Sequence, residues 1–177
     1  MIQKKVCMIG AFGVGKTSLV ARFVQSIFAE KYLTTVGVKI DKKQLFLGGQ
    51  EITLMIWDVA GKDALTAIKP EHLRGSAGYI VVADGTRAET LQTAVDLQCS
   101  AGNVTGGAPF TVVINKADLQ EKWEIDNRVL DPLKAKGWPV VLTSAKTGNG
   151  VETLFENLAI RMLRKTDGGE QSAAAPV

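Results

Sequence analysis

The chain has 177 residues, a net charge of +3 at neutral pH and two cysteines. This length suits one domain with a sizeable core. The charge is small and spread along the chain, which argues against a nucleic-acid-binding domain, where Lys and Arg cluster. No apolar run reaches about 18 residues, so we expect no membrane span. Cys7 and Cys99 lie in apolar or helical segments, and we expect both to be reduced, as in a cytoplasmic protein.

Strand-like and helix-like segments alternate along the chain, which predicts an α/β fold with a six-stranded, mostly parallel sheet and about five helices. The apolar runs predict strands over 3–9, 37–47, 50–57, 78–83, 110–114 and 139–142. The helical patterns cover 16–25, 64–74, 88–101, 122–135 and 150–164. Gly48-Gly49 indicates a hairpin, so we expect the second and third strands to be antiparallel. We assign 1–165 to one domain and 166–177, rich in Gly, Ser and Ala, to a flexible tail.

The segment from Gly10 to Thr17 reads G-x-x-x-x-G-K-T, which is typical of a phosphate-binding P-loop. Its glycines let the backbone turn so that successive N–H groups face phosphate oxygens. Lys16 can reach the β- and γ-phosphates, and the Thr17 hydroxyl can bind Mg²⁺. The predicted helix adds the positive end of its dipole. This segment therefore predicts a nucleotide site.

Three further segments place polar groups after predicted strands, where open α/β sheets bind ligands. Asp58 could hold Mg²⁺ through water, and the N–H of Gly61 could meet a γ-phosphate. The carboxylate of Asp118 can accept hydrogen bonds from N1–H and N2–H₂ of guanine, a donor pair that adenine lacks. A backbone N–H within residues 144–146 could donate to guanine O6. Thr35 lies in the loop before the second strand.

In this order and spacing, the motifs resemble those of the Ras superfamily of small GTPases, and most closely its Rab-like branch. The resemblance covers about residues 3–164. Beyond the core motifs it includes Tyr32-Leu33-Thr34-Thr35-Val36-Gly37, Trp57-Asp58-Val59-Ala60-Gly61 and Leu73-Arg74-Gly75-Ser76-Ala77-Gly78. It implies a P-loop NTPase G domain that binds GTP or GDP with Mg²⁺ and acts as a molecular switch. It also implies effector proteins that bind two switch loops, residues 30–38 and 60–74, together with an exchange factor and a GAP.

The resemblance assigns a role to each matching residue. The residues expected to wrap the phosphates are Gly13, Val14, Gly15, Lys16, Thr17 and Ser18. Those expected to bind the base are Phe28, Asn115, Lys116, Asp118, Ser144, Ala145 and Lys146. The Mg²⁺ ligands are expected to be Thr17, Thr35 and Asp58, with Asp58 in the outer shell. The residues expected to act in hydrolysis are Lys16, Thr35, Gly61 and Lys62.

Two residues depart from the family pattern, and both affect hydrolysis. Lys62 stands where the family usually has a Gln that orients the attacking water. An ammonium has donors only, so it cannot accept a hydrogen bond from that water. Phe12 stands where a small residue is usual, and its ring either obstructs the γ-phosphate side or points outward. We therefore expect slow GTP hydrolysis.

Two alternatives remain open on the sequence alone. The chain could be a GTP-binding module with negligible hydrolysis that acts as a scaffold, which Lys62 and Phe12 would favour. It could also be an ATP-using P-loop enzyme, which Asp118 argues against. The sequence ends Ala-Ala-Ala-Pro-Val, without a cysteine to prenylate, so we expect no direct membrane anchor. A bacterial or archaeal origin would account for that ending.

Overall fold

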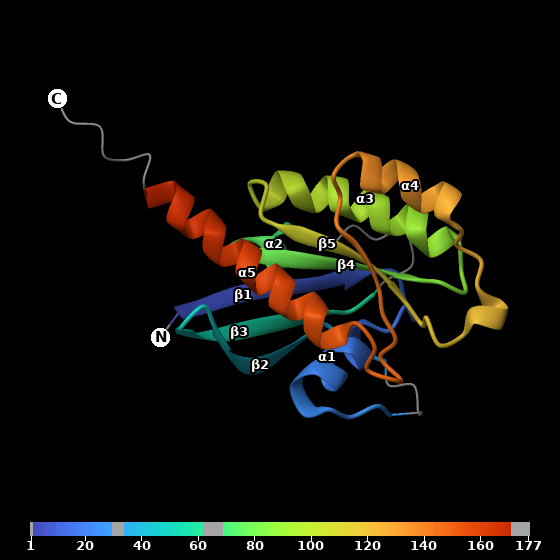
Figure 1. Cartoon of the computed structure of the whole chain (residues 1–177), viewed down its shortest axis with the longest axis horizontal. Helices are drawn as coiled ribbons and strands as arrows, with labels where there is room; N and C mark the ends of the chain where they lie inside the picture. The colour runs from blue at the N-terminus through green and yellow to red at the C-terminus, as the bar shows by residue number, and fades with distance from the viewer. Residues whose placement is uncertain (1, 30–33, 62–68, 171–177) are drawn as a thin grey trace.

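The computed structural model describes residues 2–29, 34–61 and 69–170, the last five of them as helical backbone only. These residues form a six-stranded sheet with helices on both of its faces (Figure 1). The strands are β1 (Ile2–Gly10), β2 (Val38–Leu47), β3 (Gln50–Val59), β4 (Gly78–Asp84), β5 (Phe110–Asn115) and β6 (Val140–Leu142). The helices are α1 (Lys16–Gln25), α2 (Pro70–Leu73), α3 (Glu89–Val104), α4 (Asn127–Ala135), α5 (Val151–Glu170) and the 3₁₀ turn η1 (Gln120–Lys122).

The strand order across the sheet is β2-β3-β1-β4-β5-β6. The four pairs other than β2 and β3 are parallel, while β2 runs antiparallel to β3, with Val38 opposite Val59 and Leu47 opposite Gln50. The turn between them uses Gly48 and Gly49 at φ of 57° and 81°, in the left-handed region that favours glycine. The predicted α/β class, sheet and antiparallel pair are therefore confirmed.

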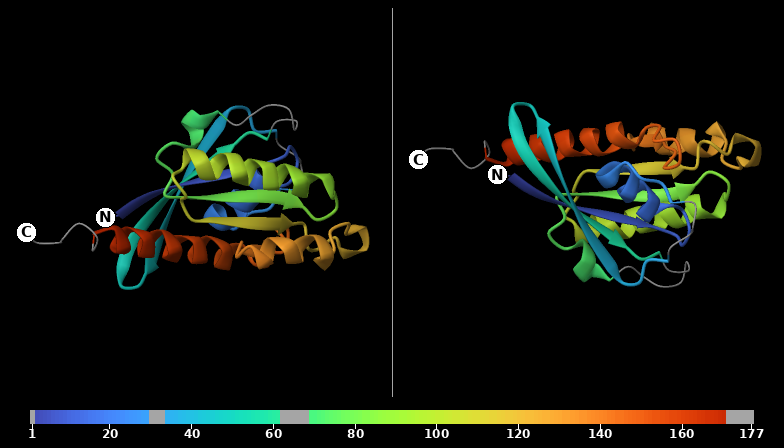
Figure 2. Two further views of the ribbon diagram at one scale, coloured as in Figure 1. Left: turned by 90° about the horizontal axis from the view of Figure 1, so that it is seen from above. Right: turned by 90° about the horizontal axis from the view of Figure 1, so that it is seen from below.

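The central strands contain buried apolar runs, because helices cover both faces of the sheet (Figure 2). These runs are residues 6–9, 79–83 and 112–114. All seven residues of β4 are buried. Successive side chains of a strand point to opposite faces. Ile80 and Val82 accordingly pack with α1 and α5, while Tyr79, Val81 and Ala83 pack with α3 and α4. Two apolar cores therefore hold the sheet rigid. No helix among the described residues is long and apolar enough to cross a membrane.

Four helices have boundaries that differ from those predicted. The helix predicted over 88–101 spans Glu89–Val104. The helix predicted over 64–74 is helical only at Pro70–Leu73 among its described residues, and 62–68 lie outside the described part of the chain. The helix predicted from 122 begins at Asn127, because Trp123 is extended and Asp126 caps the helix by accepting a hydrogen bond from the Arg128 N–H. Helix α5 continues past 164 to Glu170.

Parallel strands bring their carboxyl ends to one edge of the sheet. Gly10, Val59, Asp84, Asn115 and Leu142 are the last residues of β1, β3, β4, β5 and β6. Each is followed by a segment that carries polar groups, so the fold itself gathers these groups at a single edge. In Figure 1 this edge lies opposite the start of β1 and the end of α5.

Candidate nucleotide site

A cavity of about 560 Å³ opens at the carboxyl edge of the sheet. Thirteen of the predicted site residues line it: Gly13, Gly15, Lys16, Thr17, Ser18, Phe28, Thr35, Gly61, Asn115, Lys116, Asp118, Ala145 and Lys146. Its volume lies within the range of small-molecule and cofactor sites, roughly 300–1,000 Å³. The structure therefore brings together segments that are far apart in the sequence.

The turn from β1 into α1 depends on glycine. Gly10 has φ of 152°, and a Cβ there would lie 2.3 Å from the carbonyl oxygen of Val82. Gly15 has φ of 97°, and its Cβ would lie 2.3 Å from Nδ2 of Asn115. No real side chain fits at such distances, so both glycines are required for the close approach of this loop to β4 and β5.

Lys16 occupies the bottom of the cavity and is only 6% exposed. Its Nζ donates hydrogen bonds to the carbonyls of Gly10 and Ala11, at 3.0 and 2.9 Å. Burial lowers the pKa of Lys16 to about 8, and the negative charge of Asp58 opposes this shift. A Cβ on Gly61 would lie 2.5 Å from this Nζ, so Gly61 lies directly beside the end of the Lys16 side chain.

Thr17, Thr35 and Asp58 converge although they come from α1, the loop before β2, and β3. Oγ1 of Thr17 donates to Oδ2 of Asp58 at 2.5 Å and lies 2.6 Å from Oγ1 of Thr35. Thr35 also donates to the same carboxylate oxygen at 3.3 Å. Burial raises the pKa of Asp58, against the hydrogen bond from Thr17 and the charge of Lys16. The sequence could predict this trio because each residue belongs to a motif.

This trio fits a magnesium ion. Oδ1 of Asp58 is buried without a hydrogen-bond partner among the described residues, although a buried carboxylate oxygen needs one. Hydroxyl and carboxylate oxygens are the ligands that Mg²⁺ takes in phosphate sites. A divalent cation beside Asp58 would supply the missing partner and offset the cost of burying its charge.

On the opposite side of the cavity, Asn115 joins two loops. Its Nδ2 donates to the carbonyl of Val14 at 3.0 Å, and its Oδ1 accepts from Oγ1 of Thr143 and the N–H of Ala145, both at 3.2 Å. Asn115 therefore braces the P-loop against the segment after β6.

Asp118 and Ser144 form the other predicted pair at the base side. Oγ of Ser144 donates to Oδ1 of Asp118 at 2.6 Å and accepts from the N–H of Thr147 at 3.1 Å. Ser144 is buried and does not line the cavity, whereas Asp118 does. Ser144 therefore orients the carboxylate that faces the cavity.

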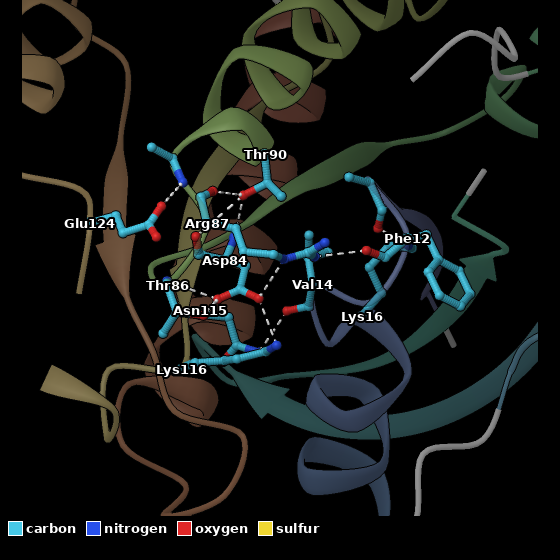
Figure 3. A network of polar contacts seen from close by, with 12 residues as sticks. Phe12, Val14, Lys16, Asp84, Thr86, Arg87, Thr90, Asn115, Lys116 and Glu124 are labelled. Carbon is cyan, nitrogen blue, oxygen red and sulfur yellow. Dashed lines mark hydrogen bonds and ion pairs between the residues drawn. The ribbon is translucent and has the colours of Figure 1, made fainter. Parts of the chain in front are cut away.

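Lys116 lies on a network that Figure 3 displays. Its backbone has φ of 70°, which is uncommon for a residue with a Cβ. Its Nζ donates to Oδ2 of Asp84 at 2.6 Å. The buried end of β4 therefore fixes this lining residue.

Besides Ser144, the predicted residues Val14 and Asp58 do not line the cavity. The side chain of Val14 is buried in the core, so only its backbone can serve the site. Phe12 lines the cavity and is 43% exposed. Lys62 lies outside the described residues.

Several residues at the site were not predicted from the sequence. Nε of Arg22 donates to the carbonyl of Ala145 at 2.8 Å, and its Nη2 donates to the carbonyl of Lys146. The unpredicted lining residues are Ala21, Gln25, Ile27, Ala29, Lys39 and Leu119. Ala21 and Gln25 follow Thr17 at intervals of four, so helical spacing could have found them. The loop residues carry no such signal.

These features define a P-loop nucleotide-binding domain, and the comparisons with known proteins specify which kind. The family model described as the Ras family matches residues 5–164. The chain is 30% identical to Ras-related protein Rab-13 of Bos taurus over 166 residues, covering 93% of this chain and 82% of that protein. It is 32% identical to Ras-related protein Rab-21 of Mus musculus over 181 residues, covering 97% and 82%. With Ras-related protein Rab-21 of Dictyostelium discoideum the identity is 33% over 174 residues, covering 93% and 78%. The chain belongs to the Ras family, and its resemblance to the Rab branch is confirmed.

Proposed function

We propose that this chain binds GTP and GDP with Mg²⁺ and works as a molecular switch that hydrolyses GTP slowly. The observation that carries the proposal is the convergence of Thr17, Thr35 and Asp58 beside the buried Lys16. Thr35 belongs to the first switch loop, so an Mg²⁺ bound to the γ-phosphate would hold that loop in place. Loss of the phosphate would release it.

Asp118 supports guanine as the base. Its carboxylate lines the cavity, and Ser144 holds one of its oxygens at 2.6 Å. The change Asp118→Asn replaces one acceptor oxygen of the carboxylate by an NH₂ donor, so it should weaken GDP binding sharply and favour xanthosine diphosphate, whose base lacks the N2 amine. Titration with both nucleotides tests this, with Asp96→Asn on α3 as the control. Unchanged GDP affinity in Asp118→Asn would contradict guanine recognition by this residue.

Slow hydrolysis rests on the replacement of the usual Gln by Lys62. Unassisted Ras hydrolyses GTP at roughly 3–5 × 10⁻⁴ s⁻¹, with about 10⁵-fold available from a GAP. We expect this chain to be no faster, and single-turnover hydrolysis of GTP measures it. A rate tenfold above that range would show that another group replaces the Gln. Lys62→Gln should accelerate the reaction modestly.

A second candidate is a GTP-bound scaffold with negligible hydrolysis. Phe12 favours this candidate, because Phe12 lines the cavity on the P-loop, where an arginine from a partner would enter. Phe12→Gly should then raise hydrolysis in the presence of a GAP of the Rab type more than it raises the unassisted rate. Equal GAP-stimulated rates for Phe12→Gly and the unmodified chain would show that Phe12 has no role in hydrolysis.

The proposed switch function also implies effector proteins that bind the switch loops. Val36 is 91% exposed and Ile40 is 47% exposed, and both lie in or next to the first switch loop. Exposed apolar side chains beside a nucleotide-dependent loop suit effector proteins. Capture with the chain loaded with GDP or with a non-hydrolysable GTP analogue would identify partners that bind one state only. An exchange factor and a GAP belong to the same proposal.

A further inference from the structure

Arg87 connects the end of β4 to the P-loop. It lies three residues after Asp84, with its side chain 38% exposed. One of its terminal nitrogens donates to the carbonyl of Phe12 at 2.8 Å, while its Nε donates to Oδ2 of Asp84 at 3.1 Å. Figure 3 shows the guanidinium between these two groups. A single planar cation therefore spans a buried carboxylate and a P-loop carbonyl.

Asp84 is a rigid anchor for this contact. Its side chain is 1% exposed, and its Oδ1 accepts from both the N–H and the Oγ1 of Thr86, at 2.9 and 2.7 Å. Burial would raise the pKa of Asp84, but the hydrogen bonds from Lys116 and Thr86 hold it below its ordinary value. The carboxylate is therefore charged at neutral pH, and its position is fixed from several sides.

The contact with Phe12 determines where the next amide points. In a trans peptide the C=O and the following N–H point in opposite directions. No cis peptide occurs among the described residues, so the Gly13 N–H points away from Arg87. Gly13 lines the cavity. A cationic donor on the Phe12 carbonyl also polarises this peptide, which makes its N–H a stronger donor.

We propose that Arg87 is a positioning residue for nucleotide binding, which aims the Gly13 N–H at the phosphates through the Phe12 carbonyl. This inference rests on the proposed nucleotide-binding function. The same Oδ2 of Asp84 also holds Lys116 on the base side of the cavity. Asp84 and Arg87 therefore connect the phosphate side of the site with the base side.

The test measures the dissociation rate of a fluorescent GDP from three variants with Mg²⁺ present. A hydrogen bond with a charged partner is worth enough for about a tenfold effect, so Arg87→Ala should release the nucleotide about tenfold faster. Arg87→Lys should resemble Arg87→Ala, because an ammonium is a point charge that cannot span both partners. Arg128→Ala removes another Asp-paired arginine, far from the P-loop in sequence and exposed, and should leave the rate unchanged.

A second readout separates positioning from general destabilisation. The ¹⁵N shift of an amide responds to hydrogen bonding at the carbonyl of its own peptide, so the Gly13 resonance of the GDP complex should move in Arg87→Ala and stay in Arg128→Ala. Unchanged release and an unmoved Gly13 resonance in Arg87→Ala would overturn the inference, as would full rescue by Arg87→Lys. Failure of the unmodified chain to bind GDP would instead overturn the proposed function.

Discussion

At the scale of single residues, the structure predicts a clear steric effect of adding a side chain at Gly61. An added Cβ would lie 2.6 Å from the carbonyl oxygen of Ala11 and 2.5 Å from Nζ of Lys16. The lysine could shift, but the backbone of the P-loop could not do so without opening the turn. The absence of a side chain at Gly61 therefore allows Lys16 and the P-loop backbone to keep their observed positions.

We predict that Gly61→Ala lowers the affinity for a non-hydrolysable GTP analogue by about tenfold, because one P-loop hydrogen bond to a charged group must be lost. Equilibrium titration with the analogue measures it. Gly102→Ala on α3 is the matched control, since its Cβ would have no neighbour nearer than 3.6 Å. Equal affinities of Gly61→Ala and the unmodified chain would show that the P-loop backbone can shift without weakening nucleotide binding.

Asp84 offers a prediction of pH dependence. Its pKa is lower in the folded chain than in the unfolded chain, whose Asp side chains titrate near 3.9. Its stabilising contribution is therefore complete above that value and is lost as the pH falls through the folded pKa. Asp84→Asn should cost about 3 kcal/mol of unfolding free energy at pH 7, because it leaves Arg87 and Lys116 without their anion.

Urea unfolding of both proteins from pH 7 down to pH 3 checks this prediction. The difference between them should be constant above about pH 5 and should shrink below pH 4. A difference that stays constant through pH 3 would mean that the Asp84 charge contributes nothing to the network.

At the scale of elements, the pair α1 and α5 supports the site from behind. Phe23 of α1 stacks on Phe155 of α5 with ring centroids 4.0 Å apart and planes 7° from parallel, and both rings are buried. Because α1 begins at Lys16, the packing of this helix also places the phosphate-facing residues. The contact between Phe23 and Phe155 thus contributes both to the stability of the fold and to the geometry of the site.

We predict that Phe155→Ala lowers the unfolding free energy by about 4 kcal/mol, since it leaves a large cavity. Phe155→Leu should cost clearly less because it refills part of that space. Chemical denaturation measures both, and Glu156→Ala, the next residue of α5, is the control. If Phe155→Ala and Phe155→Leu lowered the unfolding free energy equally, the cost would not depend on the space left empty between the two helices.

The sequence predicted strands better than helix ends, for a physical reason. Residues 79–83 form a continuous apolar run because both faces of β4 are covered, and that signal is local. The start of α4 depends instead on where Trp123 packs. A Cβ on Gly85 would lie 2.0 Å from that indole, so the Trp123 ring packs directly on Gly85, the residue after β4. A tertiary contact of this kind carries no local pattern.

At the scale of the whole molecule, the motifs predicted which segments meet, because parallel strands end at one edge. They did not predict how the segments hold one another. Asn115 lines the cavity, as the predicted base-binding role requires, and its side chain also ties Val14 to Ala145. Arg22 and Arg87 secure two of the loops through main-chain carbonyls, and contacts with main-chain atoms leave no signature in residue type.

The proposed function requires a guanine nucleotide with Mg²⁺ to fill the cavity. In the proposed function Asp118 would select guanine, Lys16 and the P-loop would bind the phosphates, and Thr17 and Asp58 would hold Mg²⁺. Binding to the folded state alone would stabilise the chain by about 2.7 kcal/mol at a ligand concentration 100 times its Kd. The expected base preference distinguishes guanine nucleotides from adenine nucleotides.

The most direct measurement is calorimetric titration of the nucleotide-free chain with GDP and with ADP, each in excess Mg²⁺. We predict saturable binding of one GDP per chain and an affinity for ADP at least 100-fold weaker, which corresponds to about 2.7 kcal/mol of discrimination. Equal affinity for the two nucleotides, or no binding of GDP, would contradict the assignment of a guanine-nucleotide switch.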